Sequence, residues 1–411
     1  MTITQSPPPG QADTAGFAAD SSRTRGFALF EYGFRPFFLL AGLYALTAVP
    51  LWLWVYSHGV AVLPGLPPHL WHGHEMLYGF IVAAIAGFLL TAVPSWTGSR
   101  GFGGRPLILL VAVWLAGRGA MVTAAWLPTW LVGVAELAFL PALAALLAPP
   151  LVRGGNRNTP LLAVIGVLWL ADVAFIVAMR STDALLAQRA LRLAIDVILI
   201  LVTVIGGRIV PAFTANALRR RGETIQIVVR PWLDPLVIAI MVAIAIVDVG
   251  WPDSHLAGVL AAIAAGAHAL RLSGWRVRRI WREPILWVLH VGYAWMPVGL
   301  ALKAVWVLTG MPWSAQWLHA LTLGTFGTMI LAVMTRASLG HTGRPLVVSR
   351  TTALSYVVLT AAVAVRVWAP AIADYFDTVL VAGALWAMAF ALYLAVYAPI
   401  LWCARADGKP G

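Results

Sequence analysis

The sequence contains very little charge and almost no cysteine. Of its 411 residues, 11% are charged and 61% are hydrophobic, with a mean hydropathy of +0.85, whereas about a quarter of the residues of a soluble domain are charged. The low charge excludes an ordinary soluble domain and predicts a multi-pass protein in a lipid bilayer. The single cysteine, Cys403, excludes an intrachain disulfide and a cysteine-rich metal cluster. Any bound metal must therefore be held by histidine, methionine or carboxylate side chains.

Acidic residues are scarce as well, with 16 against 28 basic residues and a formal net charge of +12. Such a charge can indicate nucleic-acid binding, but here the arginines lie in short loops between apolar runs, which is the pattern of membrane orientation. Loops with basic residues lie on one side of the predicted membrane. The loops on the other side, at 57–70, 248–255, 309–316 and 370–377, contain no lysine or arginine. We therefore expect no nucleic-acid partner, and we expect both termini to be cytoplasmic.

The N-terminal residues differ in composition from the rest of the chain. Residues 1–26 are rich in Pro, Gly, Ser, Thr and Ala and lack the apolar stretch of a cleavable signal peptide. This composition predicts a disordered cytoplasmic tail. Residues 27–411 are expected to form a single membrane domain.

Twelve apolar runs in that domain are long enough to cross a bilayer, for which about 20 residues are needed. The sequence therefore predicts an all-α fold of twelve transmembrane helices. The predicted spans are 35–56, 71–94, 106–127, 129–151, 160–179, 190–211, 232–250, 255–274, 285–308, 317–339, 351–369 and 376–403.

The spans show signs of a threefold repeat. Pro36, Pro160 and Pro284 open the first, fifth and ninth spans at equal intervals of 124 residues. The second and tenth spans also match, since His74 precedes Trp96 by 22 residues and His319 precedes His341 by 22. Single matches arise by chance in membrane chains, but equal spacing together with matching motifs favours three four-helix units. These pseudo-repeats cover about 35–151, 160–274 and 285–403, which makes the second, sixth and tenth spans equivalent.

Histidines lie at the predicted periplasmic ends of the second and tenth spans. His72 and His74 belong to the stretch WHGHEMLYGFIVAAIAGFLLTAVPSWTG (71–98), and His319 is the repeat equivalent of His74. An imidazole at the edge of a membrane is costly to bury and needs a metal, a haem iron or a hydrogen-bond network as partner. His74 and His319 are therefore candidate axial haem ligands, with His72 as the substitute for either. Arginines suit haem propionates, and the candidates are Arg189 and Arg192.

Small residues follow these histidines. Gly79 and Gly87 in the second span, and Gly324 and Gly327 in the tenth, would let a flat macrocycle approach the backbone. Close packing of helices explains them equally well.

Four charged residues lie well inside predicted spans, where charge is rare and normally faces the bundle interior. They form either a proton or anion path, as in a transporter or channel, or ion pairs that hold helices together. These residues are Arg118, Glu136, Asp172 and Asp196.

Four stretches spread over most of the chain resemble the NnrS family of bacterial inner-membrane proteins. They are GFRPFFLLAGLYALTAVPLWLW (33–54), the stretch 71–98, GGRIVPAFTANAL (206–218) and HALTLGTFGTMILAVMTRASLGHTGRPL (319–346). The resemblance implies a protein that binds a b-type haem and copper and is associated with resistance to nitric oxide and nitrosative stress. It leaves open whether nitric oxide is turned over by an oxidoreductase, sensed or only bound. It leaves open which respiratory protein would donate electrons.

If that resemblance holds, copper would take three imidazoles in the predicted cytoplasmic half, His268, His290 and His341, because copper readily accepts such ligands. The arrangement can also be inverted, with a second haem at this trio. Arg208 and Arg336, equivalent in the repeat, would neutralise propionates or an anion there, or merely reach the lipid headgroups. The competing functions are a transporter, against which the threefold repeat argues, and a role in delivering cofactors to respiratory proteins.

Overall fold

The structure, a computed structural model, describes residues 27–409 apart from 154 and 225–226, and these form helices. The predicted all-α fold is confirmed. The predicted disordered tail, residues 1–26, lies outside the described residues. The main helices are α1 (Phe34–His58), α2 (Pro68–His74), η2 (Glu75–Ile81), α3 (Val82–Thr97), α4 (Arg105–Val122), α5 (Thr129–Leu137), α6 (Phe139–Arg153), α7 (Leu161–Ser181), α8 (Ala184–Arg220), α9 (Leu233–Gly250), α10 (His255–Ser273), α11 (Pro284–Thr309), α12 (Trp317–His319), η5 (Ala320–Gly327), α13 (Thr328–His341), α14 (Arg350–Trp368) and α15 (Tyr375–Trp402).

These helices make up twelve spans that are long and apolar enough to cross a membrane, as the sequence predicts. The second span joins α2, η2 and α3, the fourth joins α5 and α6, and the tenth includes α12, η5 and α13. The sixth span, α8, has 37 residues and exceeds the predicted range 190–211 at both ends. Its first turn is capped by Asp183, whose carboxylate accepts a hydrogen bond from the Leu186 amide, so the polar start of α8 remains helical.

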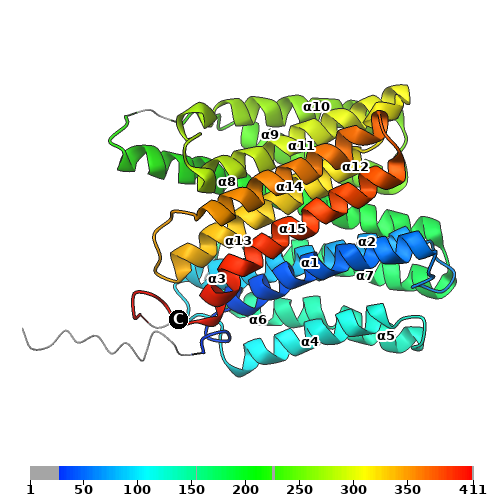
Figure 1. Cartoon of the computed structure of the whole chain (residues 1–411), viewed down its shortest axis with the longest axis horizontal. Coiled ribbons are helices and arrows are strands. Elements are labelled where there is room, and N and C mark those ends of the chain that lie inside the picture. Colours follow the sequence, from blue (N-terminus) through cyan, green and yellow to red (C-terminus); the bar gives the residue numbers. More distant parts are fainter. Residues whose placement is uncertain (1–26, 154, 225–226, 410–411) are drawn as a thin grey trace, which may run out of the picture.

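The spans run side by side through the molecule, with α4 and α5 at one edge and α10 at the opposite edge (Figure 1). Helix α15 packs against α1 and α14, which brings the last span onto the first. The two described ends of the chain also meet, because the Ala28 amide donates to the Trp402 carbonyl at 2.9 Å. An even number of spans accounts for this meeting at one end of the bundle. We call the opposite end the far end; the cytoplasmic location of the termini stays a prediction.

Two spans depart from α-helical geometry at corresponding places. The π-helical segment η2 begins directly after His74, and the π-helical segment η5 begins directly after His319. Wide π turns are uncommon and often mark functional sites. The predicted equivalence of the second and tenth spans is thus reflected in an unusual backbone feature. The corresponding part of α8 is a regular α-helix.

Aromatic rings of the protein fill the space beside the glycines that follow the two histidines. A Cβ on Gly79 would overlap the Tyr44 ring, and one on Gly324 would lie 2.7 Å from the Trp295 ring. Gly87 and Gly327 are covered in the same way by phenylalanine and tryptophan rings. Of the two interpretations left open by the sequence, close packing therefore accounts for these glycines without a macrocycle.

Candidate metal sites

His74 is the last residue of α2 and is fully buried in the bundle. Its ring lies between two aromatic rings, with centroid separations of 4.8 Å to Tyr78 and 4.5 Å to Phe175. Tyr78 is itself fixed, because its hydroxyl donates to the Leu168 carbonyl at 3.0 Å. The imidazole is thus held in one orientation by packing from η2 and α7.

Both ring nitrogens of His74 face carboxylates. Nδ1 lies 3.0 Å from Glu75 Oε1, and Nε2 lies 3.0 Å from Asp172 Oδ1. Nε2 also lies 3.8 Å from Glu136 Oε1. Arg118 donates to Glu75 Oε1 at 2.7 Å and forms a second ion pair with Glu136. The residues of this buried carboxylate cluster come from α2, η2, α4, α5 and α7, and they are His74, Glu75, Arg118, Glu136 and Asp172.

The buried carboxylate cluster has more acidic than basic groups. Three carboxylates share one guanidinium, and each of the five residues is at most 6% exposed. Charges buried in a membrane are costly unless they are paired. The cluster must therefore be neutralised by additional protons or by a bound cation. Its interior can accommodate a small occupant, since Arg118, Glu136 and Asp172 line a cavity of ≈ 10 Å³, room for about one water molecule.

His72 and His319 both lie at the far end, within the range of electrostatic interaction. His319 lies close enough to His72 and to Arg366 for their charges to act on it. The His72 ring stacks on Trp52 at a centroid separation of 4.8 Å. Neither imidazole forms a hydrogen bond within the part of the chain that the structure describes. We call His72 and His319 the far-end pair; their ring nitrogens are available to a ligand.

Arg366 of α14 is the buried cation beside the far-end pair. Its guanidinium donates to Gln316 Oε1 at 2.6 Å and to the Tyr375 hydroxyl at 2.9 Å. Of the two arginines proposed from the sequence for this role, Arg189 is exposed and Arg192 lies beside Asp196. Arg366 is therefore a preformed anion partner that the sequence analysis did not single out.

The structure separates His74 from the partner that the repeat suggested for it. His319 lies with His72, whereas both nitrogens of His74 face carboxylates of the buried carboxylate cluster. In this arrangement the carboxylates of Glu75 and Asp172 occupy the space in front of both ring nitrogens, where a haem would have to lie. The substitute named from the sequence, His72, is the histidine that joins His319.

The three histidines assigned to copper are distributed over two regions. His268 Nδ1 lies 2.8 Å from the Tyr293 hydroxyl, and His290 packs nearby against Trp275. His341 instead packs against Tyr32 and Phe34. Among the described residues, the group of three histidine or carboxylate side chains whose ligand atoms converge is His74, Glu136 and Asp172. The trio thus does not fit a copper site of three imidazoles.

The two arginines expected near that trio have different surroundings. Arg208 is exposed and donates to Asn158 Oδ1 at 2.9 Å. Arg336 is buried, and its guanidinium carbon lies 3.9 Å from the centroid of the Phe213 ring. Neither interaction involves one of the three histidines.

Asp196 belongs to a different cluster from the other three buried charges. It lies beside Asp248 and Lys303, which form an ion pair between α9 and α11. Glu136, Asp172 and Arg118 surround His74 instead. The four charges named for a proton or anion path therefore occupy two separate places.

Replacing Lys303 by methionine is expected to destabilise the protein by about 3–5 kcal/mol, because it leaves the buried Asp248 carboxylate without its partner. The double variant Lys303→Met/Asp248→Asn is expected to recover most of this loss. Equilibrium unfolding in mixed detergent micelles measures both. Equal stabilities of the single variant and the unchanged protein would show that the pair contributes nothing.

Residues 28–405 match the NnrS protein family. The chain belongs to the NnrS family. No curated protein matches the sequence. The match begins before α1 and ends after α15. It therefore includes both the far-end pair and the buried carboxylate cluster.

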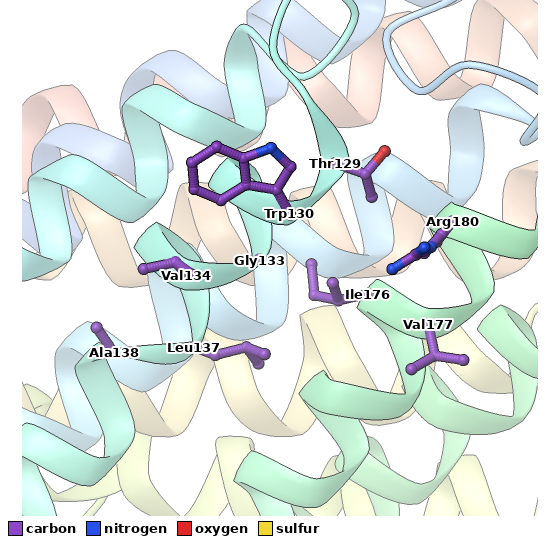
Figure 2. A pocket seen from close by; sticks show the side chains of 9 residues that line it. All are labelled: Thr129, Trp130, Gly133, Val134, Leu137, Ala138, Ile176, Val177 and Arg180. Carbon is purple, nitrogen blue, oxygen red and sulfur yellow. The ribbon is translucent and has the colours of Figure 1, made fainter.

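A further cavity in this NnrS family member is an open groove of ≈ 450 Å³ between α5 and α7 (Figure 2). Its lining is mainly apolar, with Trp130 and Ile176 on its walls and Arg180 at one end. No histidine or carboxylate lines it. The groove is thus separate from both candidate metal sites.

The sequence analysis did not single out Arg366, Lys303 and Asp248, which are buried charged residues. Each lies near the end of a predicted span, where a charged residue is less unusual than in the middle of the span. Tyr44, whose hydroxyl donates to Glu75, gave no comparable signal, because a tyrosine in a membrane helix is common.

Proposed function

We propose that this NnrS family member binds haem and copper in the bacterial inner membrane and limits damage by nitric oxide. Family membership supports the general role. The observation that carries the proposal is the far-end pair, in which His72, His319 and Arg366 lie close enough for their charges to interact. Two imidazoles with available nitrogens and a buried guanidinium are the groups that a haem requires.

The far-end residues have separate tasks in this proposal. His72 and His319 would hold the haem iron, and stacking on Trp52 keeps the His72 ring oriented. Arg366 would bind a propionate, and its contacts with Gln316 and Tyr375 fix its position in advance. A bound haem would supply an iron for nitric oxide, which could bind where one of the two imidazoles is displaced. Copper is assigned to no residue set, because His268, His290 and His341 do not converge.

An optical spectrum and a metal analysis of the purified full chain test the proposal. After expression with sufficient haem and copper, we expect a Soret band, copper in the same sample, and a spectral change when nitric oxide is added to the reduced protein. A preparation that is folded but lacks both the Soret band and copper would contradict the proposed function.

A further inference from the structure

We propose that the buried carboxylate cluster binds one divalent transition-metal ion through His74, Glu136 and Asp172. This site would be separate from the haem and copper of the proposed function. The three residues come from α2, α5 and α7, and each offers one ligand atom within 4.8 Å of the other two.

The spacing of the ligand atoms suits a small ion. His74 Nε2 lies 3.0 Å from Asp172 Oδ1 and 3.8 Å from Glu136 Oε1. A tetrahedral ion with bonds of about 2.0–2.2 Å to nitrogen and oxygen separates its ligand atoms by roughly 3.3–3.6 Å. The observed distances lie on either side of this range, so small movements of the side chains would complete the site.

The second oxygen of the Glu136 carboxylate is unsatisfied. Glu136 is 4% exposed, and its Oε2 has no hydrogen-bond partner among the described residues. Glu136 also lines the ≈ 10 Å³ cavity, together with Asp172 and Arg118. A buried carboxylate oxygen without a partner is costly, and a cation bound by the Glu136 carboxylate would satisfy it.

Charge balance also favours a dication. With Glu75, Glu136 and Asp172 ionised, Arg118 cationic and His74 neutral, the cluster carries two excess negative charges. Such an excess is not tolerated inside a membrane without compensation. One divalent ion compensates it completely, whereas the alternative requires two extra protons.

The surroundings of His74 match those of a metal-bound histidine. A histidine that binds a metal through one nitrogen usually donates the other N–H to a carboxylate, which fixes its orientation. Glu75 occupies this position at 3.0 Å from His74 Nδ1, and it is held in turn by Arg118 and Tyr44. Glu75 is therefore a positioning residue for the site.

The donor set selects the class of metal. One imidazole and two carboxylates provide nitrogen and oxygen ligands without sulfur, which suits Zn²⁺, Fe²⁺ or Mn²⁺ and disfavours Cu⁺. The cavity beside Glu136 and Asp172, of ≈ 10 Å³, has no room for a macrocycle, and carboxylates lie 3.0 Å from both ring nitrogens of His74. The ion at His74 is therefore expected to be free of porphyrin.

Metal analysis of the full chain, purified in detergent after growth with zinc, iron and manganese and after dialysis against a chelator, tests the proposal. We expect about one divalent ion per chain. Glu136→Gln and Asp172→Asn should each reduce the content at least tenfold, and Glu75→Gln should weaken binding about 10–100-fold. The matched control is Asp196→Asn, which changes a buried carboxylate outside the site and should keep the ion.

Growth with Co²⁺ provides a measurement that needs no variant. The unchanged protein should then show the visible d–d bands of cobalt with nitrogen and oxygen ligands. Absence of a retained ion and of these bands, in protein that is monodisperse, would overturn the proposal and would indicate neutralisation by protons. Equal metal content in the unchanged protein and the double variant Glu136→Gln/Asp172→Asn would overturn it as well. The Soret band of the same samples reports the proposed function independently.

Discussion

Replacing Arg118 by leucine is expected to destabilise the protein by at least about 3–5 kcal/mol, the effect of removing one partner from a buried ion pair. Arg118 pairs with Glu75 and Glu136, so its loss leaves two carboxylates without their cation. These contacts connect α4 with η2 and α5. Equilibrium unfolding in mixed micelles and the yield of monodisperse protein measure the effect.

Two comparisons separate this electrostatic cause from a general effect of losing an arginine. Arg180→Leu removes an exposed arginine of α7 and is expected to change stability by less than about 0.5 kcal/mol. Adding Glu75→Gln and Glu136→Gln to Arg118→Leu should restore much of the loss, because the unpaired charges are removed. No recovery in the triple variant would mean that Arg118 acts through packing instead.

Replacing His319 by alanine is expected to abolish the low-spin haem spectrum. The far-end pair would hold the haem iron through two imidazoles, so loss of one of them would convert the haem to a high-spin form or release it from the protein. His72→Ala is expected to give the same result for the same reason. Difference spectra of reduced against oxidised protein measure the loss, with haem extraction to distinguish a converted haem from a missing one.

The matched control is His58→Ala. His58 also lies at the far end, but it is exposed and its ring bonds to the Trp54 carbonyl at 2.9 Å. Its replacement should leave the spectrum unchanged. An unaltered low-spin spectrum in both His72→Ala and His319→Ala would contradict the assignment of the far-end pair.

The twelve spans could be predicted because each is a long apolar run, a signal contained in local sequence. The partner of His319 could not be predicted in this way. The predicted repeat relates His74 to His319, and both are followed by a π-helical segment. Equivalent backbone positions nevertheless have different neighbours, since α4, α5 and α7 bring charges to His74 while α14 brings Arg366 to His319.

For the buried charges as well, the sequence predicts which residues are unusual but not which of them meet. Burial in a span was sufficient to single out Arg118, Glu136 and Asp172 individually. Their convergence on His74 depends on how three spans are rotated and packed, which the sequence pattern does not encode. The same limit placed Asp196 with them, although it lies with Lys303.

The central claim is that His72 and His74, two residues apart, serve two different sites. The low-spin haem spectrum and the divalent metal per chain, determined side by side in His72→Ala and Glu136→Gln, test it most directly. We predict that His72→Ala loses the low-spin haem and keeps the divalent ion, and that Glu136→Gln loses the ion and keeps the low-spin haem. Loss of both from either folded variant would contradict the claim, because it would place the two histidines in one site.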